Sequence, residues 1–75
     1  MQKQTLEQIL AIQVKRRTES GAFGIAECKR EIKIEAQYLR KSLYQLLETY
    51  VEQANKDVFF NKAMVLACWE LINGR

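Results

Sequence analysis

The chain contains no proline, and its only glycines are Gly21, Gly24 and Gly74. Proline and glycine are the residues that most strongly interrupt helices. The sequence therefore offers one strong break, at residues 18–24, and a stop near residue 74. At 75 residues the chain has the length of one domain. We predict an all-α fold, with a single helical domain over residues 1–75.

A first helix is predicted from about residue 5 to residue 17. Thr5 and Gln8 have the spacing of a capping box, in which each side chain accepts a hydrogen bond from the other residue's backbone N–H. Apolar residues then follow at helical spacing: Leu6, Ile9, Leu10 and Val14. A loop over residues 18–24 should follow.

A long second helix is predicted over about residues 25–54. Apolar residues there alternate at spacings of four and three, apart from one gap at Lys29, which is a heptad seam: Ile25, Ile32, Ala36, Leu39, Leu43, Leu46 and Tyr50. Such a helix would be roughly 45 Å long at ~1.5 Å per residue. A third helix is predicted over about residues 57–73, with Asn55 or Asp57 as its cap and Asn73-Gly74 as its stop.

These lengths predict a three-helix arrangement, a helical hairpin with a long central helix plus a short N-terminal helix. The third helix is apolar nearly all round, and we expect its surplus apolar surface to be covered by a second copy in a dimer, by another helical protein, or by both. Charges beside the seam favour a parallel coiled coil, since Glu35 of one chain would meet Arg40 of the other. The alternative is that the seam receives the two shorter helices of its own chain.

The residue types argue against catalysis and against a metal or other cofactor. The chain has no histidine, which is the commonest general base. Cys28 and Cys68 are forty residues apart, which is no zinc-binding spacing, and we expect two buried thiols in a reducing compartment. Three carboxylates share one helix flank, which we interpret as a solvated face: Glu27, Glu31 and Glu35. We expect no enzyme activity.

A basic cluster leaves one alternative function open. The net charge is +3, which permits a nucleic-acid partner without favouring one. Phosphates could be contacted by the basic residues of the first two helices: Lys15, Arg16, Arg17, Lys29, Arg30 and Lys33. The alternative is therefore a nucleic-acid-binding regulator. The apolar window from residue 58 to residue 72 is too short and too interrupted to span a membrane, and we expect a cytoplasmic protein.

The favoured function is a small protein–protein interaction module, such as an adaptor, an accessory regulator or a chaperone-like binder of another helix. Its apolar helix faces would bury themselves against the partner. The predicted partner-binding residues are the large side chains of the third helix: Phe59, Phe60, Met64 and Trp69. Trp69 is the expected anchor.

Overall fold

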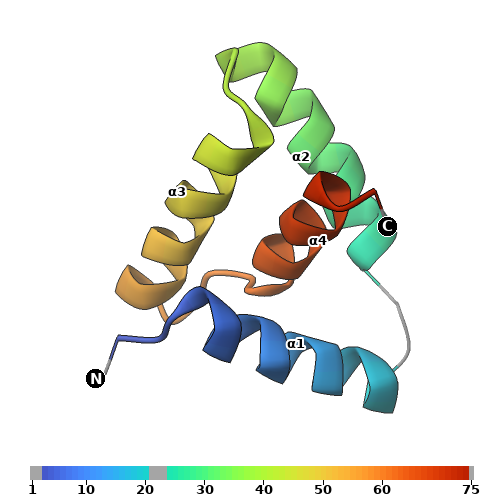
Figure 1. Ribbon diagram of the computed structural model, residues 1–75, viewed down its shortest axis with the longest axis vertical. Helices are drawn as coiled ribbons and strands as arrows, with labels where there is room; N and C mark the ends of the chain where they lie inside the picture. Colours follow the sequence, from blue (N-terminus) through green and yellow to red (C-terminus); the bar gives the residue numbers. More distant parts are fainter. Residues whose placement is uncertain (1–2, 21–23, 75) are drawn as a thin grey trace.

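The structure, a computed structural model, describes residues 3–20 and 24–74. Within these ranges the regular elements are all α-helices: α1 Leu6–Ser20, α2 Ile25–Leu39, α3 Leu43–Lys56 and α4 Ala63–Ile72 (Figure 1). The predicted all-α class is confirmed. The described residues form four helices rather than three, because the long second helix is divided.

Helix α1 begins at the predicted capping box. The Thr5 backbone N–H donates to Gln8 Oε1 (2.9 Å), and the Gln8 N–H donates to Thr5 Oγ1 (3.2 Å). The helix continues to Ser20, past its predicted end at residue 17. Of the predicted loop, residues 21–23 lie outside the described part of the chain.

The prediction of one continuous helix over residues 25–54 is wrong. Helix α2 ends at Leu39, and Arg40 adopts the left-handed conformation with φ 54° and ψ 42°. The backbone N–H of Lys41 donates to the Ala36 carbonyl (3.1 Å), which closes the helix end in the manner of a Schellman motif. The chain therefore turns sharply between α2 and α3 (Figure 1).

Helix α3 starts with a second capping box. The Gln45 N–H donates to Ser42 Oγ (3.2 Å), and the Ser42 N–H donates to Gln45 Oε1 (2.9 Å). This is the same pattern that marks the start of α1. The apolar spacing hides it, because Leu39 and Leu43 lie four residues apart and keep the helical period across the break.

Replacing Arg40 by glycine should stabilise the protein. A side chain in the left-handed region costs about 1–2 kcal/mol relative to glycine, but glycine also orders a freer unfolded chain. We expect a net gain of roughly 0.5–1 kcal/mol in the free energy of unfolding, measured by urea denaturation. Lys33→Gly, inside α2, is the matched control and should lose about 1 kcal/mol. Destabilisation by both changes would contradict the left-handed helix end.

Helix α4 begins later than predicted. Residues 57–62 form turns rather than helix, so the start at residue 57 is wrong. Asn61, not Asn55 or Asp57, is the residue whose side chain bonds the first helical N–H, that of Ala63 (3.1 Å). The predicted end is confirmed, since the helix stops at Asn73 and Gly74 takes φ 70°.

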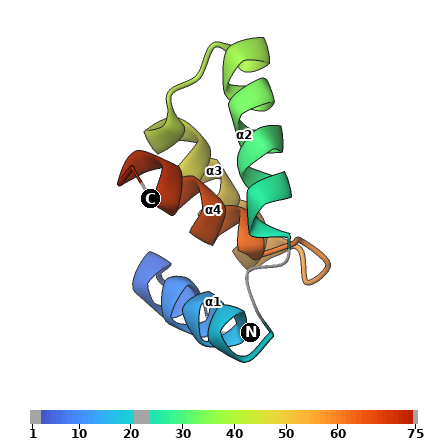
Figure 2. The same cartoon turned by 90° about the vertical axis from the view of Figure 1, so that its right-hand side faces the viewer.

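Helix α4 lies in the centre of the fold. It packs against each of the other helices, α2, α3 and α1 (Figures 1 and 2). Its middle residues are buried: Val65, Leu66, Ala67 and Cys68. A short helix that is apolar all round is explained by this position. Its own chain therefore covers much of the apolar surface for which a second copy was expected, and the dimer stays a prediction.

Four of the seven residues of the heptad seam are buried within the chain, whereas Leu39 is 43% exposed. Ile25, Ile32, Leu46 and Tyr50 are buried in the core that α4 completes. The alternative, in which the seam receives the two shorter helices of its own chain, is met in part: α4 packs on α2 and α3, whereas α1 packs on α4. A continuous parallel coiled coil over residues 25–54 is wrong, because the helix divides between Leu39 and Leu43. No helix in the described ranges is long and apolar enough to cross a bilayer.

Candidate docking surface

The segment between α3 and α4 is an ordered turn. The Phe59 N–H donates to Asp57 Oδ1 (2.9 Å), and the Phe60 N–H donates to the Asp57 carbonyl (3.1 Å). Asn61 Oδ1 then accepts the Ala63 N–H at the start of α4, as described above. Short polar side chains at both ends thus bond the turn's own backbone, as Asp and Asn commonly do, and they fix the directions of the two phenylalanines between them.

The two phenylalanines have opposite environments. Phe60 packs against the core, with its ring centroid 6.0 Å from that of Tyr50. Phe59 is 92% exposed, and its neighbour Val58 is exposed as well. Of the predicted partner-binding residues, Phe59 alone lies on the surface. Met64 and Trp69 are half-buried and pack against the core.

A hollow lies beside this turn, between it and α1. Its volume is about 420 Å³, and it is lined by Gln4, Ile12, Gln13, Arg16, Val58, Phe60, Asn61 and Lys62. Ile12 and Val58 supply exposed apolar surface. The charged side chains in the lining, Arg16 and Lys62, are both cations. We call the lining residues Ile12, Arg16, Val58 and Lys62, together with Phe59, which follows Val58 in the turn but does not line the hollow, the α1–turn face.

Contacts between Asn55 and Gln4 hold the start of α1 beside α3. The Gln4 N–H donates to Asn55 Oδ1 (2.6 Å), and Asn55 Nδ2 donates to the Gln4 carbonyl (2.9 Å). The Gln4 side chain accepts from Lys62 Nζ at 3.4 Å. Residues far apart in the sequence therefore position the rim of the hollow.

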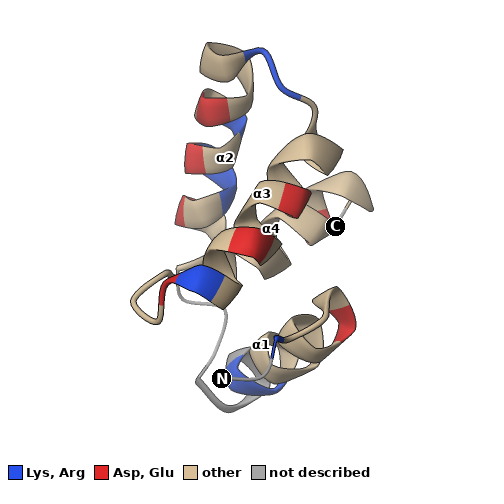
Figure 3. Cartoon of the chain, turned by 90° about the vertical axis from the view of Figure 1, so that its left-hand side faces the viewer, with Lys and Arg blue, Asp and Glu red and all other residues tan. Residues whose placement is uncertain are grey.

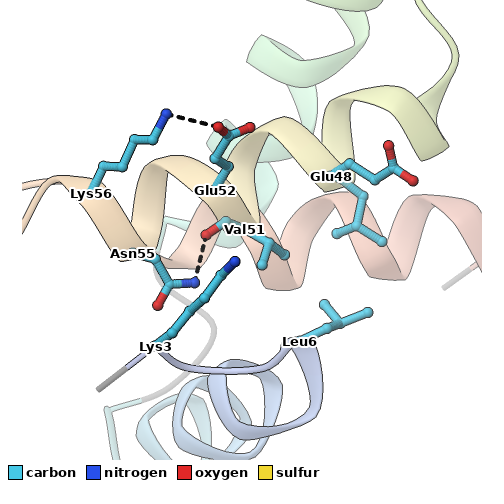
Figure 4. Close-up of a pocket in the computed structure, with 8 residues that line it drawn as sticks. Lys3, Leu6, Glu48, Val51, Glu52, Asn55 and Lys56 are labelled. Atoms are coloured by element: carbon cyan, nitrogen blue, oxygen red, sulfur yellow. Dashed lines mark hydrogen bonds and ion pairs between the residues drawn. The ribbon is translucent and has the colours of Figure 1, made fainter. Parts of the chain in front are cut away.

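A second groove, of about 610 Å³, separates the start of α1 from α3. Leu6 and Val51 face each other across it, with Lys3 toward one end and Glu48 toward the other (Figure 4). Lys56 lies 2.7 Å from Glu52 and holds the pKa of that carboxyl below its usual value. With charges of both signs in its lining, this groove has no preference for an anionic or a cationic partner.

The predicted phosphate contacts are spread over separate places. Lys15 and Arg16 lie exposed on α1, and Arg30 and Lys33 lie exposed on α2. Lys29 instead forms an ion pair with the buried Glu70, 3.0 Å away. The side chain of Arg17 lies outside the described residues. Helix α1 packs on α4 and crosses the fold below α2 (Figures 1 and 3), so it does not run back along α2 as one continuous basic patch would require.

Two exposed apolar residues on α2 were not predicted as a site. Ile34 and Tyr38 are 67% and 84% exposed. They could have been found from the seam itself, because at 100° per residue they fall opposite Ile32, among the acidic residues. Reading the carboxylates alone as a solvated flank overlooks the apolar pair between them.

Both thiols are buried and free, as predicted. Burial, together with Glu31 and Glu27, raises the pKa of Cys28, and burial raises the pKa of Cys68 to about 11. A nucleophilic cysteine needs the opposite shift. Burial and a 2.9 Å hydrogen bond to Glu35 likewise raise the pKa of Tyr50. In the described ranges, no three Cys, Asp or Glu side chains are grouped so that they could hold a metal ion.

The residues that stand out are therefore exposed apolar side chains beside cations, not a cluster of reactive groups. Searches against protein-family models, curated proteins and solved structures found no match for this chain.

Proposed function

We propose that this chain is a small, non-catalytic protein–protein interaction module, an adaptor, accessory regulator or chaperone-like binder, which docks through its α1–turn face. It acts in the cytoplasm, where the two free thiols stay reduced. The partner covers Phe59 and the neighbouring apolar side chains of the hollow.

The observation that carries the proposal is the exposure of Phe59, 92%, on a turn held by side-chain hydrogen bonds. Aromatic residues are enriched in the buried centres of interfaces. A side chain presented on an ordered backbone loses little conformational entropy when it binds, which favours affinity. The ring contact between Phe60 and Tyr50 joins the turn to the core. Phe59 takes no part in this contact, so it is not needed for the core.

The basic residues give less support to the nucleic-acid alternative. Affinity for nucleic acid grows with the number of phosphates contacted at once. Here α1 and α2 carry their cations on separate helices, and Lys29 is paired with Glu70. The exposed apolar side chains of Ile12, Val58 and Phe59 fit a protein surface better than a phosphate backbone.

Replacing Phe59 by alanine should remove most partner binding without unfolding the protein. Loss of an interface anchor costs about 2 kcal/mol or more, so we expect at least a tenfold weaker recovery of specific partners. The measurement is quantitative capture on immobilised chain, with circular dichroism melting as the check on folding. Tyr44→Ala is the matched control, since Tyr44 is an exposed aromatic on α3 outside the hollow. Equal recovery with Phe59→Ala and wild type would exclude the α1–turn face.

A further inference from the structure

We propose that the α1–turn face docks a second copy of this chain, and that it receives the outer side of α2 from that copy. The inference rests on the proposed function and identifies its partner. The contact surface on α2 consists of four exposed residues, which we call the α2 outer stripe: Glu27, Glu31, Ile34 and Tyr38.

The α2 outer stripe is compact. At 100° per residue, its four side chains fall within a sector of about 60° on the side of α2 opposite Ile32. Glu27 and Glu31 are four residues apart, as are Ile34 and Tyr38. Three residues separate Glu31 from Ile34, so each of the four side chains neighbours the next along one side of the helix. The stripe is thus an exposed amphipathic ridge with carboxylates at one end and apolar side chains at the other.

The two surfaces have complementary charge and polarity. The ionisable side chains that line the hollow are Arg16 and Lys62, with no carboxylate among its lining residues. The side chains of the α2 outer stripe that are charged at neutral pH are both carboxylates, Glu27 and Glu31. Complementary charges of this kind fix the register of an interface and reject wrong partners.

The outer side of α2 and the 57–62 turn of the α1–turn face lie toward the same side of the molecule (Figures 2 and 3). The acidic positions of α2 lie along the edge toward which the 57–62 turn projects (Figure 3), and the view from the opposite side places α2 and the turn on a common edge (Figure 2). A two-fold axis through this side would set each copy's stripe on the other copy's α1–turn face. Such a contact is made twice and closes as a dimer.

The exposed apolar side chains suffice for a contact of this kind. Each copy contributes Phe59 and Tyr38, and an aromatic side chain buries about 150–250 Å² when it is covered. Ile12, Ile34 and Val58 add aliphatic area. The two aromatic side chains alone would bury about 300–500 Å², a large part of the area of about 800 Å² per partner in a standard protein interface. The proposed dimer therefore forms through the α1–turn face and the α2 outer stripe, and not through the seam that the sequence suggested.

Reciprocal charge reversal tests the pairing. Arg16→Glu/Lys62→Glu makes the α1–turn face acidic, like the α2 outer stripe. Glu27→Lys/Glu31→Lys makes the α2 outer stripe basic, like the α1–turn face. We expect each variant alone to dimerise at least about tenfold more weakly than wild type, because like charges meet in both contacts. An equimolar mixture should regain the dimer, since every contact then joins opposite charges. Sedimentation equilibrium measures the dimer dissociation constant, and circular dichroism checks the fold of each variant.

Controls with the same change in net charge use exposed residues outside both surfaces: Lys33→Glu/Lys41→Glu and Glu7→Lys/Glu48→Lys. They should dimerise as wild type does. A wild-type chain that remains monomeric at millimolar concentration overturns the inference, as does a mixture that regains nothing. If the wild type is monomeric yet a different protein is captured in a Phe59-dependent way, the proposed function stands and only the second-copy inference fails.

Discussion

Truncating Leu66 to alanine is expected to remove most of the stability of this protein. Leu66 is 1% exposed, in the middle of α4. Leu→Ala at a fully buried site costs about 2–5 kcal/mol, from lost transfer free energy and from the cavity that remains. A chain of this length has a free energy of unfolding of about 4–11 kcal/mol. We therefore expect the melting temperature to fall by about 8–40 °C.

The size of this effect follows from the position of α4. The helix contacts α1, α2 and α3, so a cavity at its centre removes contacts to several neighbours at once. Collapse of one neighbour into the cavity would pull that helix away from the others. The cost should therefore lie toward the upper part of the range for Leu→Ala.

Leu71→Ala is the matched control for this prediction. It makes the same chemical change on the same helix, so any effect of intrinsic helix propensity is equal. Leu71 is only partly buried, and we expect it to lose about 1 kcal/mol. Both values come from urea denaturation followed by circular dichroism. A loss at Leu66 no larger than that at Leu71 would contradict the central position of α4.

The sequence predicts where helices start and stop when a side chain itself forms the cap. Thr5 with Gln8 and Asn73 with Gly74 are such positions, and both mark observed helix ends. Ser42 with Gln45 carries the same information. The heptad spacing continues across this helix start and hides it. The preceding helix end is hidden as well, because Arg40, rather than glycine, takes the left-handed conformation.

Spatial neighbours are harder to predict than helix ends. The apolar surface of α4 correctly indicates extensive burial, yet the pattern does not say whether the cover comes from its own chain or from another. That depends on the sharp turn at residues 40–42, which brings α2 and α3 to two sides of α4 (Figure 1). One missed capping box therefore changed both the number of helices and the reason for expecting a dimer.

The candidate site was predicted only in part, for a local reason. Phe59 and Phe60 are adjacent and chemically identical, and composition cannot separate them. The hydrogen bonds of Asp57 within the turn send one ring outward and the other toward Tyr50. The exposure of Phe59 is thus a property of turn geometry, whereas the burial of Cys28 and Cys68 follows from their positions on the apolar faces of α2 and α4.

Removing the cation that pairs with Glu70 is the second large perturbation that we predict. Lys29 Nζ on α2 lies 3.0 Å from Glu70 Oε1 on α4, and the two side chains are 22% and 8% exposed. Breaking a buried pair by removing one partner costs about 3–5 kcal/mol, because the remaining buried charge has lost a nearby opposite charge. Partial solvent access to Lys29 reduces this, and we expect Lys29→Met to lose about 2–3 kcal/mol.

A double-mutant cycle isolates the pair from the packing of its side chains. Glu70→Gln keeps the shape of the side chain and its capacity to accept hydrogen bonds, but it removes the charge. In Lys29→Met/Glu70→Gln no buried carboxylate is left behind, so the double variant should be more stable than Lys29→Met alone. The expected coupling is about 1–2 kcal/mol, measured by urea denaturation at neutral pH. If the two single losses simply add, the ion pair does not hold α2 against α4, and apolar packing alone joins the two helices.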